Sequence, residues 1–194
     1  MLNEPDIQPK GTVMRALLTI AMILPGFAFA AGGGDGFDST TKPPKTTKTT
    51  KECRGNRVWD PAVGRCVRPQ SSSLDQDGLM RAVRELAYAG RSADAQAVLM
   101  AMADQNDDLV QTYWGFTLRK LGNRDLALAH YRAAIDSNPD NILARSYMGQ
   151  GFVEEGDVDA AIRQWRAIIA AGGEGSWAET SLREAIRTGA TYSY

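Results

Sequence analysis

The strongest constraint on the fold is a pattern that occurs twice, 34 residues apart. When Gly122 is aligned with Gly156, positions that carry similar side chains fall into register on both sides of it. The first copy ends at Pro139 and the second at a Gly-Gly pair. The other aligned positions are Trp114 with Met148, Gly115 with Gly149, Leu118 with Phe152, Ala127 with Ala161, and Tyr131 with Trp165. A fixed period of this length predicts a repeat protein.

Each copy predicts two helices joined by a glycine turn. Small residues at Gly115 and Ala127 would let the paired helices approach closely, and the large residues beside them would fill the space between. Gly122 can adopt the left-handed conformation that ends the first helix of the pair.

A weaker copy precedes these two, and a single helix follows them. Leu86, Gly90, Ala95 and Leu99 match the pattern, with Gly90 only 32 residues before Gly122. After the last copy, the residues from Ser176 to Glu179 form a capping-box sequence that predicts a helix extending to about Thr188. This helix would cover the exposed face of the final unit, as the ends of repeat arrays require.

The period and these positions resemble the tetratricopeptide repeat over residues 74–190. The resemblance implies an all-α solenoid of about three helix-turn-helix repeats with a C-terminal capping helix. It also implies a concave groove that binds a protein or peptide partner, and we expect about half of the groove residues to be buried between helices. The groove residues by this mapping are Arg84, Tyr88, Leu109, Thr112, Tyr113, Phe116, Arg119, Lys120, Leu143, Ser146, Tyr147, Gln150 and Val153.

The mapped groove lacks one feature of chaperone-binding relatives. Those relatives clamp a carboxylate with lysine and asparagine side chains, whereas the corresponding positions here hold Thr112, Phe116, Ser146 and Gln150. The resemblance therefore does not extend to recognition of a C-terminal carboxylate.

The N-terminal region predicts export. From Met14, a single arginine is followed by an apolar run that is too short for a comfortable membrane span, and Ala28 to Ala30 form an A-x-A cleavage sequence. We interpret residues 1–30 as a signal peptide, with Met14 as the expected start of translation. The mature protein is expected to begin at Ala31. The predicted location is periplasmic or secreted, with no stable membrane span after cleavage.

The two cysteines of an exported protein predict a disulfide. Cys53 and Cys66 flank two short strand-like runs separated by turn residues, so residues 53–68 are expected to form a disulfide hairpin, with residues 69–73 as a linker. This segment resembles the second half of a peritrophin-type chitin-binding motif, which implies that Trp59 stacks on a sugar ring. The alternative is a hairpin at the edge of the linker that the disulfide stabilises and that has no role in sugar binding.

A basic region precedes the acidic repeats. Residues 42–68 contain eight basic and two acidic residues, a net charge of +6. Residues 74–194 contain twelve basic and seventeen acidic residues, a net charge of −5. The linker 31–52 is expected to be disordered, and its lysines recur at every third position from Lys42 to Lys51. In a polyproline II conformation they would share one face and could contact peptidoglycan or another anionic envelope surface. The alternative is a solvated spacer.

No catalytic motif is recognisable in the sequence. The single histidine, His130, is expected to be a packing or surface residue, and the loop from Asp104 lacks the glycine and glutamate that a calcium loop requires. We predict no enzyme activity, no cofactor, no metal and no nucleic-acid partner. Two hypotheses for function remain: a protein-interaction scaffold of the cell envelope, or a module that binds an envelope polymer.

Overall fold

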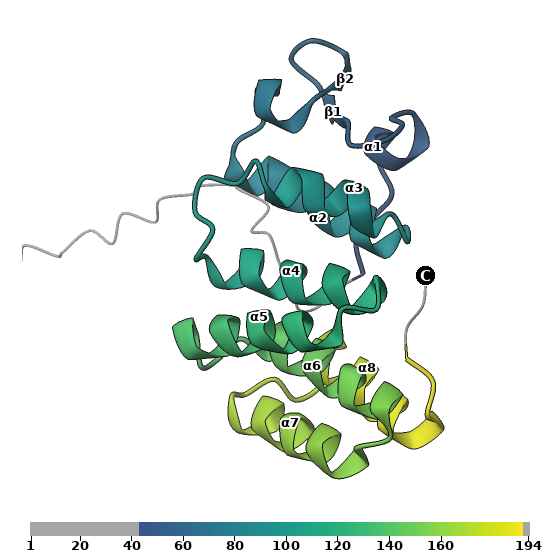
Figure 1. Ribbon diagram of the computed structural model, residues 1–194, viewed down its shortest axis with the longest axis vertical. Helices are drawn as coiled ribbons and strands as arrows, with labels where there is room; N and C mark the ends of the chain where they lie inside the picture. Colours follow the sequence, from purple (N-terminus) through teal and green to yellow (C-terminus); the bar gives the residue numbers. More distant parts are fainter. Residues whose placement is uncertain (1–42, 192–194) are drawn as a thin grey trace, which may run out of the picture. The chain divides into compact units, whose positions relative to one another are not determined.

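The computed structural model describes residues 43–191. The expected signal peptide and the first part of the expected linker lie outside these residues. The described residues form eight α-helices and one small antiparallel sheet, so the prediction of a mainly helical fold with a disulfide is confirmed. Figure 1 shows the order of these elements.

Seven of the helices follow one another from Gln76 onward. Neighbouring helices pack as antiparallel pairs, and the last helix packs on the two that precede it. The helices are α2 (Gln76–Tyr88), α3 (Ser92–Leu99), α4 (Asp108–Lys120), α5 (Arg124–Ser137), α6 (Ile142–Glu155), α7 (Val158–Ala170) and α8 (Trp177–Thr188).

Glycine turns join the helices within a pair. Gly122 has a φ of 85°, and the backbone N–H of Asn123 donates to the carbonyl oxygen of Leu118 at 2.9 Å. Gly156 has a φ of 79° and follows α6 in the same way. The positive φ lets the chain turn back so that backbone groups at the helix end find partners.

Small residues allow the helices of a pair to approach closely. A Cβ atom added to Gly115 would lie 2.6 Å from the ring of Tyr131, which is buried on α5. Ala127 on α5 is also buried. Trp114 is half-buried and stacks on the ring of His130, with the ring centroids 6.0 Å apart.

The two cysteines form the predicted disulfide. Strand β1 (Val58–Asp60) pairs with β2 (Arg65–Val67), with Trp59 opposite Cys66. Both carboxylate oxygens of Asp60 accept hydrogen bonds from Ser73, at 2.6 and 2.7 Å. The expected linker at 69–73 is therefore bound to the hairpin, and its first part forms a short 3-10 helix, η1 (Pro69–Ser71).

The hairpin shares its core with the helices, although the sequence predicts a linker at 69–73 between them. Val58 is fully buried in the same apolar cluster as Leu79 and Val83 of α2. Arg91, at the start of α3, donates to the backbone carbonyl oxygens of Cys53 and Gly55. The hairpin therefore belongs to the helical domain.

The last part of the expected disordered linker is also bound to α2. Thr47 caps α1 (Lys48–Lys51), and the carboxylate of Glu85 accepts hydrogen bonds from the backbone N–H and the hydroxyl of both Thr47 and Thr50. The prediction of a polyproline II face is wrong over these residues, because the buried carboxylate binds donors that only a helical turn brings together. Lys42 lies outside the described residues.

Candidate interaction surface

Most of the predicted groove residues are buried. Ten of them are inaccessible, more than the expected half, and only Leu109, Lys120 and Val153 are half-buried. The prediction that these side chains line an open groove is therefore wrong for most of them. The buried residues are Arg84, Tyr88, Thr112, Tyr113, Phe116, Arg119, Leu143, Ser146, Tyr147 and Gln150.

An aromatic cluster fills the space that an open groove would leave. Tyr88 of α2 stacks on Phe116 of α4 with centroids 5.7 Å apart and an interplanar angle of 11°. Phe116 lies 4.8 Å from the ring of Tyr147 on α6, and Trp177 at the start of α8 lies 5.7 Å from the ring of Tyr88. The hydroxyl groups of Tyr88 and Tyr147 form a hydrogen bond. Four helices thus meet through their rings.

The residues at the clamp positions bond to other parts of the chain. The hydroxyl of Thr112 accepts from the side-chain amide of Asn141 at 3.0 Å and donates to the carbonyl oxygen of Asp108 at 2.7 Å. Ser146 donates to the carbonyl oxygen of Ala178 at 2.7 Å. These side chains hold α6 to its neighbours, so they are not available to a ligand.

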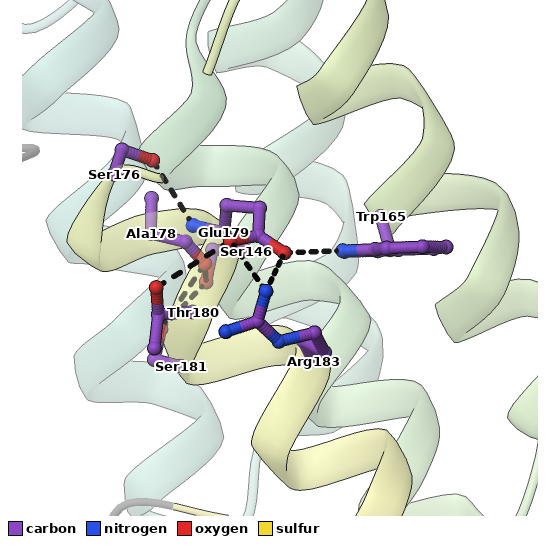
Figure 2. Close-up of polar contacts among 8 residues, drawn as sticks. All are labelled: Ser146, Trp165, Ser176, Ala178, Glu179, Thr180, Ser181 and Arg183. Atoms are coloured by element: carbon purple, nitrogen blue, oxygen red, sulfur yellow. Dashed lines mark hydrogen bonds and ion pairs between the residues drawn. The ribbon is translucent and has the colours of Figure 1, made fainter. Parts of the chain in front are cut away.

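Helix α8 is bound to α7 by a buried carboxylate (Figure 2). Glu179 accepts hydrogen bonds from the indole N–H of Trp165 at 2.8 Å and from Arg183 at 3.2 Å. Its backbone N–H donates to the hydroxyl of Ser176 at 3.1 Å. The hydrogen bond of the predicted capping box to the Ser176 hydroxyl is therefore present. The Glu179 side chain instead bonds to Trp165 on the neighbouring helix α7.

Three charged side chains meet at the end of α4. Arg119 is buried and donates to a carboxylate oxygen of Glu154 at 2.5 Å, and the ammonium group of Lys120 lies 3.9 Å from the same oxygen. The hydroxyl of Thr191 also donates to this oxygen, at 2.5 Å. The cationic centres of Arg119 and Lys120 lie 5.7 and 5.8 Å from the ring centroid of Phe116.

This arrangement shifts the pKa of both Lys120 and Glu154. Burial lowers the pKa of Lys120, and the nearby charge of Arg119 lowers it further. Burial alone would raise the pKa of Glu154, but Arg119, Thr191 and Lys120 together lower it below its ordinary value. Glu154 is therefore held as a carboxylate beside two cations.

A hollow of about 380 Å³ opens beside this cluster, between the end of α2 and the end of α4. We call it the α2–α4 hollow. Phe116 and Ala87 provide apolar wall, Lys120 provides a cation, and Leu121 is an exposed leucine at its border. Its size falls within the range of small ligand pockets. The remaining lining residues are Gly90, Arg91, Ser92, Ala93 and Asp94.

Arg91 holds one wall of the hollow in place. Its guanidinium donates to Asp94 at 2.8 Å, to the carbonyl oxygen of Cys53 at 3.1 Å and to that of Gly55 at 2.6 Å. Because three acceptors fix the planar guanidinium group, the disulfide loop and the α2–α3 turn form one surface.

Sequence reasoning missed two residues that line the hollow, Arg91 and Leu121, and one ring of the aromatic cluster, Trp177. Arg91 and Leu121 directly flank the turn glycines Gly90 and Gly122, and the sequence pattern assigned them only to turns. Trp177 was assigned only to the cap of α8. The positions of these three residues depend on contacts between distant helices, which a local pattern does not encode.

The hairpin carries exposed cations. Trp59 is half-buried, and the ammonium group of Lys48 lies 4.1 Å from its ring centroid, so one face of the indole is covered. A sugar would have to use the other face or displace this lysine. The exposed basic residues of this region are Lys45, Lys48, Lys51, Arg54, Arg57, Arg65 and Arg68.

Comparison with models of known families, with characterised proteins and with solved structures gives no match to this chain. None of the helices within residues 43–191 has the length and apolar character needed to cross a membrane. Over the same residues, no group of three or more histidine, cysteine, aspartate or glutamate side chains is placed to hold a metal ion.

Proposed function

We propose that this chain is a non-catalytic, exported adaptor of the tetratricopeptide-repeat type, and that its α2–α4 hollow binds a segment of a partner protein. Three helical pairs with glycine turns, followed by a single helix, support this interpretation. The close approach at Gly115 supports it as well, since a small residue at that position belongs to the repeat pattern.

The observation that carries the proposal is the chemistry of the hollow. An apolar wall that includes Phe116 lies beside the half-buried ammonium group of Lys120. An apolar side chain that enters would displace water from this wall, and an adjacent carboxylate would pair with the lysine. The partner segment is therefore apolar or aromatic and carries an acidic residue.

The proposal replaces the long groove by a smaller site. Because the aromatic cluster is internal, Phe116 lines the hollow with little exposed surface and mainly supports the fold. Export is proposed from the signal-like N-terminus, and a disulfide is compatible with it.

Site-specific photocrosslinking in intact cells tests the proposal. A photoreactive residue at Leu121 should give a discrete crosslinked partner, because Leu121 is 48% exposed at the border of the hollow. The matched control is Leu126 of α5, which is 58% exposed and does not line the hollow. Equal crosslinking from both positions, or none from Leu121, would contradict the proposal.

A second candidate function rests on the exposed cations of the hairpin region. Seven basic side chains between residues 45 and 68 are exposed. Of the two acidic side chains, Asp60 is buried and bonded within the hairpin, and Glu52 is exposed beside Lys48. We propose that this face binds an anionic envelope polymer. Cosedimentation with peptidoglycan should then decrease steeply as salt rises from low to physiological concentration. Binding that is independent of salt would contradict this candidate.

A further inference from the structure

We propose that Arg57 and Arg68, which the strand register places opposite each other on the outer face of the hairpin, bind a carboxylate group of an anionic envelope polymer. The inference rests on the second candidate function, because it treats the hairpin region as a polymer-binding face. It adds the chemical group that is recognised and the two side chains that recognise it, which we call the arginine pair.

The register of the hairpin brings the two arginines together. Strand β1 pairs with β2 in antiparallel fashion, so that Val58 lies opposite Val67. Continuing this register by one residue places Arg57 opposite Arg68, and the backbone of Arg68 is still extended, with φ −69° and ψ 144°. Residues directly opposite each other have Cβ atoms about 4.5–5.5 Å apart, so two long arginine side chains at these positions can reach one ligand.

The arginine pair lies on the face of the hairpin that is turned away from the helical core. Successive side chains of a strand point to opposite faces, and Val58 is fully buried among the helices on the inner face. Arg57 is the neighbour of Val58 and therefore belongs to the outer face, as does Arg68 across from it, and both are exposed. Trp59 shares this face and is half-buried. The outer face thus presents two guanidinium groups beside an indole ring.

The charge of the arginine pair is not balanced by acidic side chains of the described residues. None of the ion pairs among residues 43–191 includes either member. Of the two acidic side chains in this region, Asp60 is buried and bonded to Ser73, and Glu52 lies 3.7 Å from the ammonium group of Lys48. Like charges directly opposite each other destabilise a hairpin, so an anion that binds both arginines would relieve this repulsion.

Neighbouring contacts hold the backbone on both sides of the arginine pair in place. Gly55, two residues before the first arginine, accepts a hydrogen bond from Arg91 at 2.6 Å. Pro69 directly follows the second arginine and is buried, and the disulfide to Cys53 fixes Cys66 two residues before it. A site whose backbone is already ordered loses less conformational entropy when a ligand binds.

Arginine is better suited than lysine to bind a carboxylate in this way. A guanidinium group is planar and can donate two parallel hydrogen bonds to one carboxylate, whereas an ammonium group acts as a point charge. Two opposed guanidinium groups can therefore engage both oxygens of the same carboxylate. Charge attraction alone would not distinguish arginine from lysine, so replacing one by the other separates specific recognition from a general attraction.

Charge-preserving variants of the full chain test the inference. The double variant Arg57→Lys, Arg68→Lys keeps both charges but removes the planar donors. We expect it to bind peptidoglycan about tenfold more weakly than the unaltered chain, as measured by cosedimentation at low salt. The matched control is Arg54→Lys, Arg65→Lys, which alters two exposed arginines outside the pair and should bind within about twofold of the unaltered chain. Equal affinity of the two double variants, with both folded by circular dichroism, would overturn the inference.

Modified peptidoglycan tests which anion is recognised. Coupling its carboxylates to a neutral amine should abolish cosedimentation of the unaltered chain. Unchanged binding to the modified polymer would show that the arginines recognise another anion, such as a phosphate, and would overturn the assignment of a carboxylate site.

A soluble probe separates this inference from the second candidate function. Short polyglutamate carries carboxylates without any sugar, and calorimetry can measure its binding to the same variants. If polyglutamate binding depends on the arginine pair but peptidoglycan does not cosediment with the chain, the carboxylate site is supported and the candidate function fails. If peptidoglycan cosediments in a salt-dependent way, and both double variants bind it and polyglutamate equally, the inference fails alone.

Discussion

Arg91 donates a hydrogen bond from its guanidinium group to the carbonyl oxygen of Cys53, at 3.1 Å, and so ties the disulfide loop to the turn between α2 and α3. The same side chain bonds to Gly55 and Asp94. Because Val58 of the hairpin is also fully buried in the helical core, hairpin and helices should unfold together.

The first prediction concerns the disulfide. The double variant Cys53→Ser, Cys66→Ser should lower the free energy of unfolding of the whole domain by about 3 kcal/mol, since the bond closes a short loop of the unfolded chain. Denaturant titration followed by circular dichroism measures the change. A helical transition that is unaffected by the double substitution would show that the hairpin is independent.

The second prediction concerns the close contact of α4 and α5. Gly115→Ala should destabilise the domain by about 1–3 kcal/mol, because the new methyl group would overlap the buried ring of Tyr131. Gly151→Ala on α6 is the matched control. Its nearest neighbour is a side-chain carbon of Arg119 at 3.2 Å, and alanine favours the helix by about 1 kcal/mol. Thermal melts of both variants measure the difference in stability. Equal destabilisation would contradict the close contact between Gly115 and Tyr131.

The third prediction concerns the attachment of α1. Glu85→Gln should release Thr47 and Thr50 from α2, because the amide group cannot accept all four hydrogen bonds that the carboxylate accepts. Limited trypsin digestion should then cut faster after Lys48 and Lys51. The control is Glu52→Gln, which alters an exposed carboxylate. Unchanged cleavage of the Glu85 variant would contradict this role.

The fourth prediction concerns acid stability. The folded-state pKa of Glu154 lies below its ordinary value of 4.5, so its contribution to stability is complete above pH 4.5 and is lost as pH falls through the folded-state pKa. Glu154→Gln should destabilise the domain at pH 7, because the buried Arg119 loses its charged partner, and should flatten the decrease in stability below pH 4.5. An unchanged pH profile, measured by denaturant titration at each pH, would argue against this pairing.

Local sequence patterns were sufficient to predict the helical pairs and the disulfide. Gly122 and Gly156 take positive φ values because a helix must end where the next one begins. The spacing of Cys53 and Cys66 likewise fits a hairpin. In each case the residues that interact are close in sequence, or recur at a fixed period.

The open groove could not be judged from the same patterns. Tyr88 and Tyr147 are 59 residues apart, and their contact depends on how successive helices turn relative to each other. That turn places four helices around one aromatic cluster and buries Phe116. The α2–α4 hollow arises from the same packing, together with Arg91, which no repeat position identifies.

The most direct test of the central claim is the affinity of the partner recovered through Leu121, measured by calorimetry for two matched variants. Lys120→Ser removes the cation of the hollow, whereas Arg132→Ser removes an exposed cation on α5. We predict that Lys120→Ser weakens binding about tenfold or more and that Arg132→Ser leaves it within about twofold, as expected for loss of one charged hydrogen bond. Equal affinities for both variants, with both folded by circular dichroism, would contradict the assignment of the hollow as the binding site.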